Sequence, residues 1–246
     1  MEFSFSRNSV VADEIKDIVI ADVALAIAFA FLFTGGITNF APDLFLFFMP
    51  IALVTSSLTF VLHEYMHKIV AQRFGATAAF RRSDVGLMLT LLSGAFGFLM
   101  GLPGATMIYT NRFTREEDGY VSLAGPLTNF AIFLVFYAIF IFLFKSSPYI
   151  VLTLWPSNAT SVPYLELMLA FTLFISAWLA FFNMLPIYPL DGSKVFRWNK
   201  LVYFVAMAAI FIFLYSIVGP GLVIDLVVML IIAFFISVMF SGMRLF

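Results

Sequence analysis

The chain has 246 residues, of which 63% are hydrophobic and only 11% are charged. Soluble domains of this length carry about a quarter charged residues, so this composition excludes a single water-soluble core and predicts a multi-pass membrane protein. The net charge of −1 gives no indication of a nucleic-acid partner, and the absence of cysteine excludes disulfides and thiolate metal ligands.

The first 17 residues are polar and acidic, without the basic start and small-residue cleavage site of a signal peptide, so we expect no removable leader. Beyond them, six apolar segments approach or exceed the 20 or so residues that a helix needs to cross a bilayer. A Gly-Pro-Gly turn separates the last two segments. The predicted membrane helices are 18–33, 44–74, 119–144, 164–185, 201–218 and 222–243.

The segment 85–111 is also uncharged, but it is rich in glycine. Basic loops stay on the cytoplasmic side of a membrane, and residues 68–84 and 191–200 are both basic. The two loops share one side only if 85–111 does not cross, so we interpret this segment as re-entrant. The fold class is therefore an all-α membrane protein with six transmembrane helices, a re-entrant segment around 85–111 and both termini in the cytoplasm.

The organisation predicted is one membrane domain over residues 1–246, in which the helices 18–33, 201–218 and 222–243 flank the central part. Its loop between residues 145 and 163 would face outside and contains the glycosylation pattern Asn158-Ala159-Thr160. Whether that pattern is used stays open.

Residues 60–70 read F-V-L-H-E-Y-M-H-K-I-V and contain the two histidines of the chain. His63 and His67 are four residues apart, so on a helix both imidazoles leave the same face and can reach one zinc ion at about 2.0–2.1 Å. In the pattern H-E-x-x-H the glutamate, here Glu64, is the base that takes a proton from the nucleophilic water. The spacing therefore predicts a catalytic zinc site at the end of the second apolar segment.

A catalytic zinc ion usually has three protein ligands and one open position. Without cysteine or a third histidine, the third ligand must be a carboxylate. Asp191 is the best candidate, because Pro186 and Pro189 break the helix before it and because it lies beside a basic loop on the predicted cytoplasmic side.

Two motifs, H-E-Y-M-H at 63–67 and N-M-L-P-I-Y-P-L-D-G at 183–192, resemble those of the site-2 protease family of intramembrane zinc metalloproteases. The resemblance implies that His63, His67 and Asp191 bind one zinc ion and that Glu64 is the catalytic base. It also implies that Asn183 contacts the substrate carbonyl or the developing oxyanion. The resemblance covers a core at about 44–192, in which the stretch A-G-P-L-T-N at 124–129 looks like the family's middle core helix. The role of Asn129 stays open.

The activity implied is hydrolysis of peptide bonds in or near the transmembrane segments of membrane-protein substrates. We expect a multi-pass protein of the cell membrane, with its active site toward the cytoplasm. Its expected partners are the lipid bilayer and membrane-protein substrates with a transmembrane segment. The sequence leaves open the substrate, the gating of substrate entry and whether the chain forms a homo-oligomer.

This chain departs from the family pattern at Ser193, where relatives often have a second glycine, and it has no room for a PDZ or regulatory domain. One alternative is the class of prenyl-protein peptidases, in which a glutamate is the third ligand; Glu166 is the candidate for that role. A second alternative is a protein without catalytic activity, either a transporter or a scaffold that binds substrates. Few charged residues in the apolar segments and no paired broken helices argue against a transporter, and the presence of Glu64 argues against an inactive scaffold.

Overall fold

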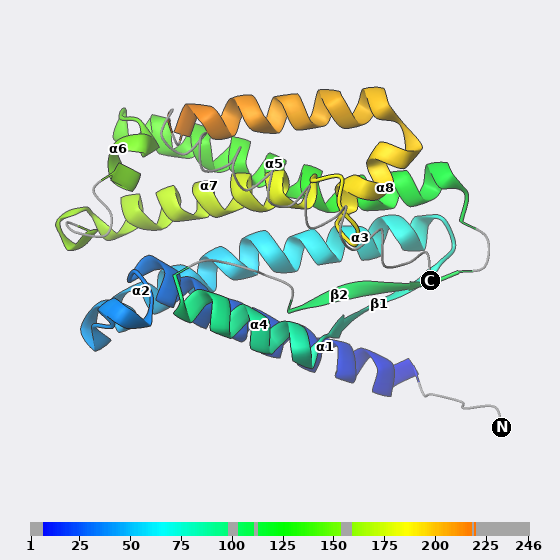
Figure 1. Cartoon of the computed structure of the whole chain (residues 1–246), viewed down its shortest axis with the longest axis horizontal. Coiled ribbons are helices and arrows are strands. Elements are labelled where there is room, and N and C mark those ends of the chain that lie inside the picture. Colours follow the sequence, from blue (N-terminus) through cyan, green and yellow to red (C-terminus); the bar gives the residue numbers. More distant parts are fainter. Residues whose placement is uncertain (1–6, 98–102, 111–112, 154–158, 218, 220–246) are drawn as a thin grey trace, which may run out of the picture. The chain divides into compact units, whose positions relative to one another are not determined.

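The computed structural model describes residues 7–97, 103–110, 113–153, 159–217 and 219. The described residues form two compact units, one up to residue 110 and the other from residue 113 onward. Most of the described residues are helical, and Figure 1 shows that each unit is built from long helices.

The first unit combines helices with a small sheet. Its described elements are α1 (Arg7–Phe33), the 3-10 turn η1 (Ile37–Asn39), α2 (Pro42–Ser56), the π-turn η2 (Ser57–Val61), α3 (Leu62–Arg73), β1 (Thr77–Arg82), α4 (Asp84–Ala95) and β2 (Gly104–Tyr109). The helices α2 and α3 continue through η2 as one apolar helix, Pro42–Arg73.

The second unit is helical throughout its described part. Its elements are α5 (Arg115–Phe144), α6 (Pro148–Thr153), the 3-10 turn η3 (Ala159–Ser161), α7 (Tyr164–Asn183), α8 (Asp191–Trp198) and a last helix, Lys200–Ile217. Helix α5 begins with a capping box, in which the Thr114 hydroxyl accepts from the N–H of Glu117 while the Glu117 carboxylate accepts from the N–H of Thr114.

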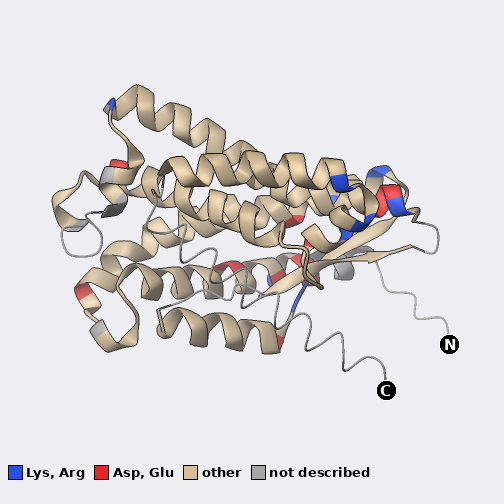
Figure 2. Ribbon diagram, turned by 45° about the horizontal axis from the view of Figure 1, so that its top comes forward, with Lys and Arg blue, Asp and Glu red and all other residues tan. Residues whose placement is uncertain are grey.

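Among the residues that the structure describes, four helices are long and apolar enough to cross a membrane: Pro42–Arg73, Arg115–Phe144, Tyr164–Asn183 and Lys200–Ile217. They correspond to four of the six predicted spans, and the chain is a multi-pass integral membrane protein. Figure 2, in which the ribbon is coloured by charge, shows the long helices tan along most of their length. Helix α1 includes the predicted span 18–33 but is not among the four, and the predicted span 222–243 lies outside the described residues.

The sequence predicted no strand, yet β1 and β2 form an antiparallel two-stranded sheet (Figure 1). The six residues of β2 lie inside the glycine-rich segment 85–111. That segment was interpreted as re-entrant from the charge of the two basic loops 68–84 and 191–200. Its partner β1 ends 22 residues earlier in the chain, so the pairing depends on contacts that a local hydrophobic pattern does not reveal.

Helix α4 is apolar on its exposed side and small or polar on its buried side. The buried residues are Gly86, Thr90, Ser93 and Gly94, and the exposed apolar residues are Val85, Met88, Leu89 and Leu92. A Cβ added at Gly94 would lie 2.6 Å from the Cα of Ala28 on α1, so the two helices pack at a close approach that favours glycine. Twelve residues extend about 18 Å, which is less than the roughly 30 Å hydrocarbon core.

The two ends of the segment that contains α4 lie next to each other. The N–H of Ser83, just before α4, donates to the carbonyl of Pro103, just before β2, at 2.9 Å. The pair Arg82 and Gly104 then begins the sheet register. The segment between Ser83 and Pro103 therefore begins and ends at neighbouring positions.

A buried carboxylate joins three elements of the first unit. Glu14 of α1 accepts two contacts of 2.7 Å from Nζ of Lys68 on α3 and one of 3.1 Å from the N–H of Phe80 on β1. Its side chain is only 7% exposed, so these partners offset the large cost of burying an unpaired charge. Helix α1 is thereby fixed to both α3 and the sheet.

Candidate metal centre

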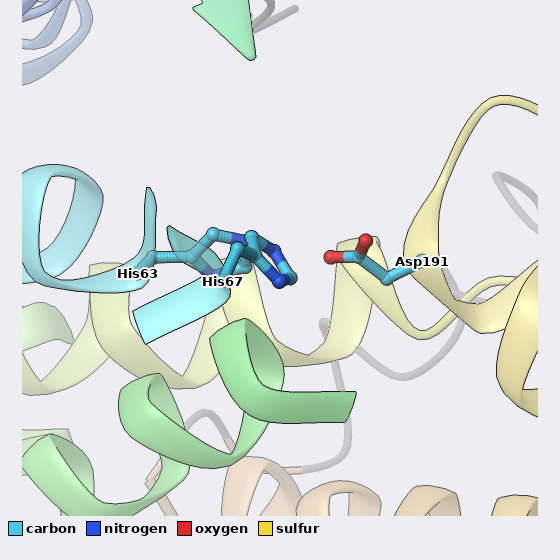
Figure 3. Close-up of side chains that lie close together, drawn as sticks. All are labelled: His63, His67 and Asp191. Carbon is cyan, nitrogen blue, oxygen red and sulfur yellow. The ribbon is translucent and has the colours of Figure 1, made fainter. Parts of the chain in front are cut away.

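The two histidines lie on α3 with their rings on one side of the helix (Figure 3). Their Nε2 atoms are 3.0 Å apart, and both residues are buried, at 5% and 7% exposed. Two nitrogens at about 2.05 Å from one tetrahedral zinc ion would lie about 3.3 Å apart. A shift of a few tenths of an ångström would therefore make the pair bidentate, and the donor set fits a zinc ion.

The π-turn η2 (Ser57–Val61) lies directly before the helix that holds these histidines. A π-turn adds a residue to one helical turn and so rotates everything after it by about 100° relative to a regular α-helix. The Ser57 hydroxyl in this turn donates to Oδ2 of Asp22 on α1 at 2.6 Å, which gives the acidic residue in the first apolar segment a protein partner. The turn thus orients the buried faces of His63 and His67 and is itself tied to α1.

Glu64 follows the first histidine and is half-buried. Its Oε2 accepts from the N–H and from the hydroxyl of Thr106 on β2, both at 2.8 Å. The candidate base is therefore bound to the sheet in the first unit. No sequence pattern identified Thr106, because it lies alone in a glycine-rich segment without a recognisable motif.

Asp191 belongs to the second unit and is the first residue of α8, where Figure 3 labels its carboxylate. As predicted, the chain between α7 and α8 is not helical: the N–H of Ile187 donates to Leu185 O and that of Leu190 to Ile187 O, both at 2.8 Å. Asp191 is half-buried, and a carboxylate in the first turn of a helix is favoured by the helix dipole.

The residue after Asp191 must be small. A Cβ added at Gly192 would lie 2.1 Å from the carbonyl oxygen of Met184 and 2.6 Å from that of Leu185. The next residue, Ser193, donates from its hydroxyl to Leu190 O at 2.8 Å, so the serine that departs from the family pattern has a local role in closing the turn.

We expect Gly192→Ala to destabilise the start of α8, because the added methyl group collides with backbone that cannot move without breaking the turn. Overpacking of this kind costs about 1–3 kcal/mol, and thermal unfolding in detergent measures the loss. The control is Ser193→Ala, which removes one hydrogen bond and should cost about 1 kcal/mol. Equal stability of Gly192→Ala and the wild type would contradict the close approach.

The remaining candidates lie on the long helices of the second unit. Asn183 is the last residue of α7, and its Nδ2 donates to Leu179 O at 3.0 Å. Glu166 lies in the first turn of α7, at the opposite end of that helix. Asn129 is fully buried in α5, and Asn158 lies outside the described residues.

These observations define a class of protein: an integral membrane protein with an H-E-x-x-H helix whose buried histidines suit a metal ion. Comparison with known proteins is consistent with this class. The model of Peptidase family M50 matches residues 50–199, a range that contains both motifs. The chain belongs to Peptidase family M50, which confirms the predicted resemblance to site-2 proteases and makes the chain a metalloprotease.

Two relatives illustrate the range of similarity. "Putative zinc metalloprotease MJ0611" of Methanocaldococcus jannaschii is 36% identical over 202 residues, which cover 82% of this chain and 90% of the relative. "Putative zinc metalloprotease YwhC" of Bacillus subtilis is 28% identical over 178 residues, which cover 62% of this chain and 72% of the relative. No solved structure matches the chain significantly.

Proposed function

We propose that this chain is an intramembrane zinc metalloprotease that hydrolyses peptide bonds in or near transmembrane segments of membrane-protein substrates. The observation that carries the proposal is the buried pair His63 and His67, with Nε2 atoms 3.0 Å apart, near one end of a helix long enough to cross the membrane. Polar residues in such a position are costly and therefore indicate function.

In this proposal His63, His67 and Asp191 hold one zinc ion. Since α7 is 20 residues long, Glu166 and Asn183 lie about 26 Å apart along its axis. Only one end of α7 can share a membrane side with the histidines, and the charge pattern favours the end that leads to Asp191. Because the ligands come from both units, the proposal requires residues 1–246 to act as one catalytic domain.

The topology proposed has six membrane helices, cytoplasmic termini and a re-entrant segment at 85–111. Support comes from the adjacent ends of the α4 segment, which meet at Ser83 and Pro103, and from the length of α4, which is too short to cross. The apolar outer side of α4 suits lipid, and the hydroxyls of Thr90 and Ser93 donate within the helix to Gly86 O and Thr90 O, as a segment within a membrane requires.

For the reaction, a bound zinc ion would supply Lewis-acid activation of a water molecule and of the scissile carbonyl. Glu64 takes a proton from the attacking water as the new C–O bond forms, and it passes that proton to the nitrogen as the C–N bond breaks. Asn183 would stabilise the oxyanion by redirecting the amide that now donates to Leu179 O; such a donor contributes about 10²–10³ in rate.

A helical substrate hides its carbonyls in hydrogen bonds, so it must unwind before hydrolysis. In the described part of the chain β2 has a partner on one side only. We propose that the unwound substrate adds to the outer edge of β2 as an extended strand. The side chains of Met107 and Tyr109, which are 46% and 58% exposed, would contact it.

The test is cleavage of a panel of single-span substrates by the purified protein in lipid, before and after removal of metal by a chelator. We expect cleavage by the untreated protein, loss of cleavage after chelation, and recovery when one equivalent of zinc is restored. Persistent cleavage after complete removal of metal would end the zinc-protease proposal.

A further inference from the structure

Two hydrogen-bond donors of one β2 residue converge on the candidate base. The N–H and the hydroxyl of Thr106 each lie 2.8 Å from Oε2 of Glu64, and the hydroxyl also lies 3.0 Å from the backbone carbonyl of Glu64. Among the described residues no donor contacts Oε1 of this carboxylate. One oxygen of the Glu64 carboxylate is therefore held by β2.

The position of Thr106 in the sheet explains why its N–H is available. Thr106 lies opposite Phe80, yet the N–H of Phe80 donates to Glu14 and that of Thr106 donates to Glu64. The two residues therefore form a non-hydrogen-bonded pair, whose backbone groups point away from the partner strand. The neighbouring pair Ala79 and Met107 is then a hydrogen-bonded pair of the ladder.

The same alternation determines which backbone groups of β2 point toward β1 and which point away from it. Gly104, Thr106 and Ile108 direct their N–H and C=O groups outward, while Ala105 and Met107 direct theirs to β1. Among the outward N–H groups, that of Thr106 donates to Glu64. The carboxylate thus binds the middle one of the three residues of β2 whose backbone groups point outward.

We propose that Thr106 is the positioning residue for the catalytic base: its hydroxyl and N–H hold the Glu64 carboxylate at the middle rung of the β2 edge. This inference rests on the proposed function. It means that the strand proposed to receive the substrate and the base that acts on it are joined directly. The hydrogen bonds between Thr106 and Glu64 do not involve the proposed metal ligands His63, His67 and Asp191.

The test compares Thr106→Val, which keeps the N–H and the shape but lacks the hydroxyl, with Thr106→Ser, which keeps the hydroxyl. The matched control is Thr77→Val, the same change at an exposed position of β1 in the same sheet. We expect Thr106→Val to lower kcat about tenfold with KM and zinc content unchanged. Thr106→Ser should recover most of kcat, and Thr77→Val should equal the wild type.

A second measurement tests the hydrogen bond between the Thr106 N–H and Glu64 without depending on enzyme activity. It is residue-level amide hydrogen exchange in the metal-free protein. Glu64→Ala should speed exchange of the Thr106 amide at least about tenfold and leave the Met107 amide, which bonds across the ladder, unchanged. The proposal is overturned if the Thr106 amide exchanges equally in both proteins. It is also overturned if Thr106→Val cleaves as well as Thr77→Val, or if Thr106→Ser is as slow as Thr106→Val.

Failure of the proposed function gives a different result. If neither chelation nor Glu64→Gln affects cleavage, the zinc-protease proposal fails, while the exchange of the Thr106 amide still decides whether Glu64 is held by β2. If zinc content falls together with kcat in Thr106→Val, the residue supports the metal centre as a whole and the positioning role is wrong.

Discussion

Glu64→Gln is expected to keep zinc and lose cleavage of transmembrane substrates. The amide has nearly the shape of the carboxylate and its oxygen can still accept from Thr106, so the fold of α3 and the histidine pair should persist. It has no basic oxygen to take a proton from water, and general base catalysis contributes about 10²–10⁴ in rate. Turnover of a single-span substrate and zinc per chain are the two measurements.

The matched control is Glu116→Gln, which makes the same change at an exposed position in the first turn of α5. It should cleave at the wild-type rate. Normal turnover by Glu64→Gln would rule out Glu64 as the base, and loss of zinc in this variant would show that Glu64 is a ligand instead.

Asp191→Asn is expected to weaken zinc binding by at least about 100-fold, because a neutral amide oxygen replaces the one anionic ligand of the proposed set. Activity should fall with metal content and return in part at high zinc concentration. Zinc per chain, measured after dialysis against a series of buffered zinc concentrations, gives the change in affinity.

Glu166→Gln is the comparison that separates the two metalloprotease classes. Glu166 begins α7 and Asp191 follows its other end, so a site built on one excludes the other. We expect Glu166→Gln to bind zinc like the wild type. Loss of zinc in Glu166→Gln together with normal binding in Asp191→Asn would favour the prenyl-protein peptidase class.

Helices were predictable where length and hydropathy act together. The spans within 44–74, 119–144, 164–185 and 201–218 all correspond to helices that the structure describes. The two strands were not predictable, because Thr77–Arg82 and Gly104–Tyr109 are short and pair across a segment of 21 residues. Both strands contact α3 and β1 also contacts α1, and local sequence does not encode these contacts.

The site was predictable to the extent that it depends on spacing. An interval of four residues places His63 and His67 on one face of any helix, and the structure adds that both are buried. The contact between Glu64 and Thr106 joins residues 42 positions apart. It depends on which backbone N–H groups of β2 point away from β1. That property follows from strand register and cannot be obtained from either residue alone.

The burial of Glu14 has a consequence for the order in which this protein is assembled during synthesis. The partners of its carboxylate lie 54 and 66 residues later in the chain, and ribosomes add about 5–20 residues per second. For roughly 3–13 seconds the carboxylate lacks Lys68 and the N–H of Phe80 as partners, and burying it without them is too costly. The start of α1 must therefore wait in water, and α1 completes its docking only after β1 has left the ribosome.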